Sequence, residues 1–202
     1  RRVLFRSVQF TSLKSNFTAQ YAGVTFKIDS IYLANVRNNA TVMGEEDTEA
    51  DYFRGGPVEF AVIQGLIDPE ANVNASFAKT YETPLVLSSE SGELDATALG
   101  FDKYINANQP EYAEEDGYLT RLLITGTLMD GDRELGKKYF HIPLKLVDDT
   151  GNVASNKFFK ISATITGEGS PNPDEILENA CINFSIEVAP WNVVEQTEED
   201  TN

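Results

Sequence analysis

Apolar and polar residues alternate with a period of two along most of this chain. In the segments 159–165 and 182–188 every second residue is apolar, and the residues between are mostly polar. Because successive side chains of a β-strand point to opposite faces, this pattern predicts strands that bury one face. Further runs of this kind lie at 24–36, 58–63, 84–87, 118–128 and 139–147. The first of them is long enough for one half-buried strand or a bent pair.

Turn signals separate these segments. The Asp130-Gly131 pair lies between the runs 118–128 and 139–147 and predicts a hairpin. No segment of about ten residues keeps apolar spacings of three and four, so only short helices are expected, at 69–78 and at 173–179 with Asn172 as a cap. The predicted fold is all-β, an antiparallel β-sandwich with one or two short helices.

Composition narrows the classes of partner. The chain has 202 residues and 41% hydrophobic content, which suits one full domain, with room for part of another. Its 32 acidic and 16 basic residues give a net charge of −16. Such a charge repels phosphate backbones, so no nucleic-acid partner is expected. No stretch approaches the roughly 20 apolar residues of a membrane-spanning helix, so no membrane span is expected either.

Few residues of the chain have side chains suited to catalysis, disulfide formation or metal binding. Cys181 is the only cysteine, which excludes an intramolecular disulfide, and its apolar alternating surroundings indicate a buried side chain. His141 is the only histidine and lies opposite the apolar face of a predicted strand, with no nucleophile or orienting acid near it in sequence. The acidic residues at 45–51, or Asp130 with Asp132, could bind calcium, but they lack the roughly 12-residue spacing of an EF-hand. We expect no enzyme activity, no cofactor and no metal.

The last third of the chain carries several motifs in a specific order. Asn-Lys-Phe-Phe-Lys-Ile at 156–161 precedes Ile-Thr-Gly-Glu-Gly-Ser-Pro-Asn-Pro at 165–173, and an apolar strand at 181–190 ends before Trp191. This order resembles the closing region of the fimbrillins, the major and minor pilus subunits of Bacteroidales. Residues 26–36 are similar to a run that those subunits carry earlier in the chain.

The resemblance implies two tandem transthyretin-like β-sandwich domains, exported to the cell surface as a lipoprotein precursor. It also implies trimming by an arginine-specific protease, which opens a groove for a donor strand from a neighbouring subunit. On this mapping residues 8–40 end a truncated N-terminal β-domain and residues 41–202 form the C-terminal domain. Residues 1–7 resemble a translated sequencing adapter and are left out of the fold. The expected terminal or donor strand contains Ile182, Phe184, Ile186, Val188, Trp191, Val193 and Val194.

The resulting prediction is a structural subunit of an extracellular fimbria that polymerises by donor-strand exchange and supports adhesion. Its expected partners are other fimbrial subunits and host or bacterial surface receptors. One alternative is a tip or accessory adhesin. Another is a carbohydrate-binding β-sandwich that stacks Tyr104, Tyr112 and Tyr118 on sugars. The run 182–188 also alternates as an ordinary core strand would, in which case 191–195 is the exchanged part.

Overall fold

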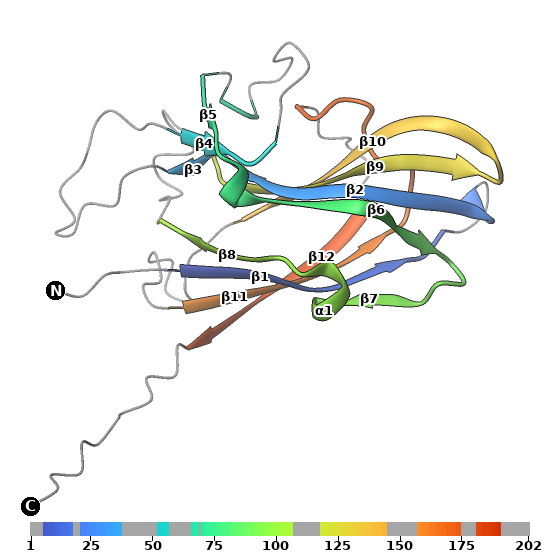
Figure 1. Cartoon of the computed structure of the whole chain (residues 1–202). Helices are drawn as coiled ribbons and strands as arrows, with labels where there is room; N and C mark the ends of the chain where they lie inside the picture. The colour runs from blue at the N-terminus through green and yellow to red at the C-terminus, as the bar shows by residue number, and fades with distance from the viewer. Residues whose placement is uncertain are drawn as a thin grey trace, which may run out of the picture.

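The structure is a computed structural model that describes residues 6–17, 21–37, 52–56, 66–68, 70–106, 118–144, 157–174 and 181–190. These residues form two facing β-sheets and a small third sheet at one end (Figure 1). The predicted all-β sandwich is therefore confirmed.

The first sheet has the strand order β12-β11-β1-β7, with β8 also paired to β1. Its strands are β1 (Arg6–Ser15), β7 (Glu93–Asp95), β8 (Asp102–Ile105), β11 (Lys157–Ile165) and β12 (Ile182–Pro190). β1 and β11 run parallel, and the other pairs in this sheet are antiparallel. The sheet therefore departs from a purely antiparallel sandwich at one pair. Parallel neighbours need a long crossover, and here the whole second sheet lies between them in chain order.

The second sheet has the order β10-β9-β2-β6, with every pair antiparallel. Its strands are β2 (Val24–Ala34), β6 (Ala78–Ser88), β9 (Arg121–Asp130) and β10 (Arg133–Pro143). The third sheet joins the short strands β3 (Val36–Arg37), β4 (Tyr52–Arg54) and β5 (Asn72–Val73). Two short helical elements are the one-turn α1 (Ala96–Leu99) and the 3-10 turn η2 (Ala75–Phe77).

The predicted strands correspond to observed ones. β9 and β10 form the hairpin, in which Asp130 pairs with Arg133 and Gly131 adopts the left-handed backbone that this tight turn requires (φ 57°). The run 24–36 forms β2, with a bulge between Ile28 and Ser30, and continues into β3. The run 84–87 belongs to β6, whereas 58–63 lies outside the described residues.

The short helices are only partly where they were predicted. η2 lies inside the predicted segment 69–78, and the Asn74 side chain caps it. Most of 173–179 lies outside the described residues, although the Asn172 side chain accepts a hydrogen bond from the Asp174 backbone N–H (2.9 Å), as a cap would. α1 was not predicted. Asp95 caps it at one end and Gly100, in the left-handed conformation (φ 54°), ends it.

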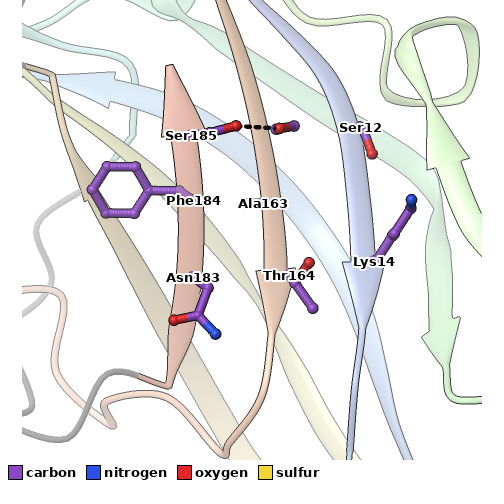
Figure 2. A pocket seen from close by; sticks show the side chains of 8 residues that line it. Ser12, Lys14, Ala163, Thr164, Asn183, Phe184 and Ser185 are labelled. Atoms are coloured by element: carbon purple, nitrogen blue, oxygen red, sulfur yellow. Dashed lines mark hydrogen bonds between the residues drawn. The ribbon is translucent and has the colours of Figure 1, made fainter. Parts of the chain in front are cut away.

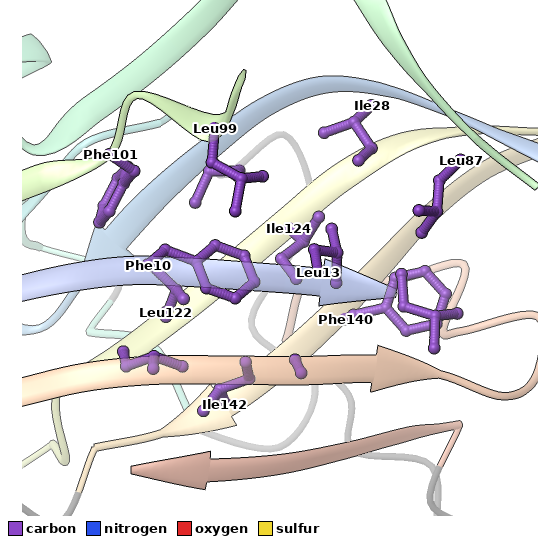
Figure 3. Close-up of a cluster of buried hydrophobic side chains, with 14 of the residues drawn as sticks. Phe10, Leu13, Ile28, Leu87, Leu99, Phe101, Leu122, Ile124, Phe140 and Ile142 are labelled. Atoms are coloured by element: carbon purple, nitrogen blue, oxygen red, sulfur yellow. The ribbon is translucent and has the colours of Figure 1, made fainter. Parts of the chain in front are cut away.

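The main core lies between the two sheets (Figure 3). Strands of both sheets supply apolar side chains to it, as with Phe10 from β1 and Ile124 from β9, both fully buried. Phe26 and Phe140 meet edge to face with ring centroids 5.1 Å apart. The packing of the two sheets' apolar faces in one core explains why the sequence needs no long helix to bury its apolar residues.

The predicted division near residue 40 does not separate two packed units in the described part of the chain. β1 and β2 precede that point, yet they pair with β11 and β9 and share one core with them. Arg6 and Ser7, which fall in the segment left out of the fold, belong to β1 and are buried. The described residues on both sides of position 40 thus form one two-sheet unit.

Candidate functional site at the C-terminal edge strand

β12 is the last described strand and lies at one edge of the first sheet. It pairs antiparallel with β11 from Ile182 opposite Ile165 to Pro190 opposite Lys157. Among the described residues no strand pairs with its other side. An edge strand offers a row of backbone N–H and C=O groups to any further strand that approaches it.

The predicted apolar face of β12 points toward the core but is incompletely covered. Ile182 and Ile186 are half-buried and pack against the main core. Phe184 is 42% exposed and Val188 is 38% exposed. On the neighbouring strand β11, by contrast, Phe159 is fully buried. The two strands have the same alternating sequence pattern, so the difference comes from position in the sheet: β11 has neighbours on both sides and β12 has one.

Mostly polar side chains line the outer face of this edge (Figure 2). Ser12, Lys14, Ser162, Thr164, Asn183 and Ser185 line a shallow depression of about 230 Å³, together with Ala163 and Phe184. Ser162 and Ser185 share a hydrogen bond across the β11–β12 pair (2.8 Å), and Lys14 forms an ion pair with Glu93 (3.1 Å). Because both faces of β12 remain partly accessible, none of residues 181–189 is buried.

The structure describes only some of the other predicted site residues. Trp191, Val193 and Val194 lie outside the described residues, as does Tyr112. Tyr104 is 56% exposed on β8, whereas Tyr118 is half-buried and meets Tyr52 edge to face (5.9 Å between centroids). The described tyrosines therefore do not form one exposed aromatic platform.

The only histidine and the only cysteine of the chain are both at least half-buried. His141 is buried on β10, and burial, with a smaller contribution from the nearby Arg121 charge, lowers its pKa to about 4. Cys181 is half-buried beside Gly167, and its backbone carbonyl accepts hydrogen bonds from the N–H groups of Thr166 (2.8 Å) and Gly167 (3.3 Å). Among the described residues, no group of three or more histidine, cysteine, aspartate or glutamate side chains is placed to hold a metal ion.

Of the two acidic segments considered as calcium ligands, the structure describes one. Asp130 and Asp132 flank Gly131 in the β9–β10 turn, and residues 45–51 lie outside the described part of the chain. No helix in the described part is both long and apolar enough to cross a membrane.

Comparison with known proteins identifies the fold. No family model and no curated protein matches the chain. Among solved structures it is similar to a fimbrilin from Porphyromonas gingivalis, with 18% identity and a TM-score of 0.69 over 96% of this chain and 59% of that one. It is also similar to candidate cell adhesion proteins from Bacteroides eggerthii (15% identity, TM-score 0.61, 93% of this chain and 56% of that one) and Parabacteroides distasonis (19%, 0.60, 93% and 59%).

These neighbours agree with the fimbrillin resemblance of the C-terminal motifs. At such low identities they show a shared fold, and the chain spans less than two thirds of each of these proteins. They do not single out any residue of β12. The structure itself therefore supplies the two features that distinguish β12: its position at the sheet edge and the exposure of Phe184 and Val188.

Proposed function

We propose that this protein is a structural subunit of an extracellular fimbria and that its C-terminal edge strand, or the segment after it, is donated to a neighbouring subunit. The proposal includes export as a lipoprotein precursor, head-to-tail partners of the same kind, and adhesion to host or bacterial surface receptors. It is supported by the shared fold with the fimbrilin and by the motif order in the last third of the chain. The observation that carries it is the incomplete burial of β12.

Strand exchange needs a strand that can leave its own sheet without unfolding the core. β12 meets this requirement because none of residues 181–189 is buried, whereas Phe159, Ile161 and Ile165 of the adjacent β11 are fully buried. Apolar burial stabilises by about 25 cal/mol per Å² removed from water, so half-exposed side chains hold β12 less firmly than buried ones hold β11. β12 is therefore more readily released from the first sheet than its neighbour β11.

The alternation of β12 also suits insertion into a partner. Ile182, Phe184, Ile186 and Val188 present one apolar face, and the backbone of an inserted strand can continue a ladder on both of its sides. In a groove both the ladder hydrogen bonds and the apolar burial would be more complete than at the edge where β12 now lies. Because donor and acceptor surfaces differ, such contacts are heterologous and build an open filament.

Three variants of the full-length protein test this proposal in an assembly assay followed by electron microscopy. We expect Phe184→Asp to block filament growth because a charge on the apolar face cannot enter a dry groove, while the subunit stays folded since Phe184 is already 42% exposed. Glu187→Gln, on the outward face of β12, is the matched control and should assemble normally. Deletion of 191–202 distinguishes β12 from the segment after it.

The outcomes separate the hypotheses. Loss of filaments with Phe184→Asp supports β12 as the exchanged strand, and loss with the deletion alone supports the following segment. Filaments of normal length from both variants would refute donation by this end of the chain. A protein that caps growing filaments of another subunit without extending them would instead be a tip or accessory subunit.

A further inference from the structure

A second group of buried residues lies on the outer face of the second sheet, opposite the main core. Tyr32, Ala34, Ile67 and Leu123 form a small apolar cluster there. The strand register places His141 opposite Leu123 and Arg121 opposite Ala34 on the same face. Ile67, which comes from the segment 66–68, is fully buried in this cluster. The segment 66–68 therefore covers part of the outer face, and we call it the cover segment.

The cover segment is held by polar contacts from two directions. On one side lies Asn35, the one non-glycine residue with positive φ among the described residues (φ 56°). Its Nδ2 group donates hydrogen bonds to the carbonyls of Leu66 (2.8 Å) and Leu119 (2.9 Å). Its Oδ1 atom accepts a hydrogen bond from the Asp68 N–H (3.0 Å). On the other side the Asp174 Oδ1 accepts from the backbone N–H groups of Leu66 (2.9 Å) and Ile67 (2.8 Å). Asp174 is fully buried.

Asp174 is itself fixed to β10 by a chain of short contacts. Its backbone N–H donates to Asn172 Oδ1 (2.9 Å), and the Asn172 N–H donates to Ser170 Oγ (3.0 Å). Ser170 then exchanges two backbone hydrogen bonds with Tyr139 of β10 (2.8 and 2.9 Å). The carboxylate that holds the cover segment is thus anchored to the second sheet itself.

The guanidinium group of Arg121 and the imidazole of His141 are buried close to the Asp174 carboxylate. Arg121 is 8% exposed and His141 is 9% exposed. Within the described residues, neither ring nitrogen of His141 has a hydrogen-bond partner, and Nε and Nη1 of Arg121 also lack one. The charged groups that act on His141 are Arg121 from β9, which disfavours a second positive charge, and Asp174 from the 170–174 segment, which favours it.

We propose that Arg121, His141 and Asp174 form an acid-sensitive catch, in which protonation of His141 releases the cover segment from the outer face of the second sheet while the main core stays folded. A protonated imidazole has two N–H donors, and both would be buried without partners among the described residues beside the Arg121 guanidinium. Ile67 of the cover segment is buried in one cluster with Leu123, the register partner of His141. In the proposed open state this face of the sheet is exposed to water, which reduces the penalty. The main core is not involved, because Phe140 and Ile142, the neighbours of His141 on β10, point to the opposite face.

The direction of the pH effect follows from the two states of the imidazole. With the cover closed the pKa of His141 is about 4, and with the cover open it returns toward the ordinary value of about 6.5. The open state therefore binds the proton more tightly, and opening becomes more favourable as the pH falls from about 6.5 to about 4. We expect the opening equilibrium to rise about tenfold at pH 5.5 and about seventyfold at pH 4.5 relative to pH 7.5.

Hydrogen–deuterium exchange, corrected for the intrinsic effect of pH, tests the catch directly. At pH 4.5 the Leu66 and Ile67 amides should lose about seventyfold in protection relative to pH 7.5, while amides of the β2–β9 pair keep theirs. His141→Gln cannot take up a charge at this position and should remove the pH dependence. Asp174→Asn should expose the same amides at pH 7.5, because an amide group is a weaker acceptor than the carboxylate.

Two results would overturn the proposal: equal protection of the cover segment at pH 7.5 and pH 4.5, or the same acid-induced loss in His141→Gln as in the native protein. Loss of protection in the β2–β9 pair together with the cover segment would show global acid unfolding and would equally contradict a local catch. Should Asp174→Asn fail to fold, the comparison of native protein with His141→Gln still decides the outcome.

Discussion

Replacing Gly126 with alanine is expected to destabilise the protein by about 3 kcal/mol or more. Gly126 lies in the middle of β9, opposite Ile28 of β2 and Lys138 of β10. A Cβ atom at this position would lie 2.1 Å from the Lys27 carbonyl oxygen and 2.9 Å from Ile28 Cα. Both contacts are backbone, so no side chain can rotate away, and β2 would have to shift within the sheet.

The measurement is the free energy of unfolding from urea denaturation, compared with that of Gly131→Asn. Gly131 lies in the exposed β9–β10 turn with a left-handed backbone, and a Cβ atom there would meet nothing within 4 Å beyond its own chain neighbours. Because asparagine tolerates this conformation, the control should stay within about 1 kcal/mol of the native protein. Equal stability of the Gly126→Ala variant and the native protein would contradict the close approach of β9 and β2.

The strands with an unbroken period of two could be predicted from the sequence, whereas β1 could not. In β1 the buried apolar residues are Val8, Phe10 and Leu13, because an irregularity between Phe10 and Ser12 shifts the register against β11. A bulge of this kind moves the apolar residues from even to odd positions and breaks the alternation. The parallel pairing with β11 is also non-local, joining segments about 150 residues apart, so no local pattern indicates it.

At the candidate site, too, the sequence predicts the strand but not its position in the sheet. The alternation predicts that Ile182, Phe184, Ile186 and Val188 share one face of a strand, and all four lie on β12. It does not predict that Phe184 and Val188 stay exposed, because that depends on how many neighbours the strand has. No local pattern predicts how the cover segment is held: Asn35 and Asp174 contact it from distant parts of the chain, and only the capping role of Asn172 has a local signal.

Alanine substitution of two phenylalanines on adjacent strands should give very different losses of stability. Phe159 of β11 and Phe184 of β12 both belong to the apolar faces of their strands, yet Phe159 is fully buried and Phe184 is 42% exposed. Phe159→Ala leaves a cavity in a closed core and should cost about 3–5 kcal/mol. Phe184→Ala removes a side chain that solvent already reaches, and we expect a loss of about 1 kcal/mol or less.

Chemical denaturation of both variants with the same residue change isolates the effect of strand position. A large loss for Phe159→Ala with a small one for Phe184→Ala means that β12 contributes little to holding the monomer together, so its apolar residues are available to a neighbouring subunit. A similar loss for both would mean that β12 is as integral to the core as β11. Strand donation would then have to fall to the segment after β12, because releasing β12 itself would unfold the first sheet at its edge.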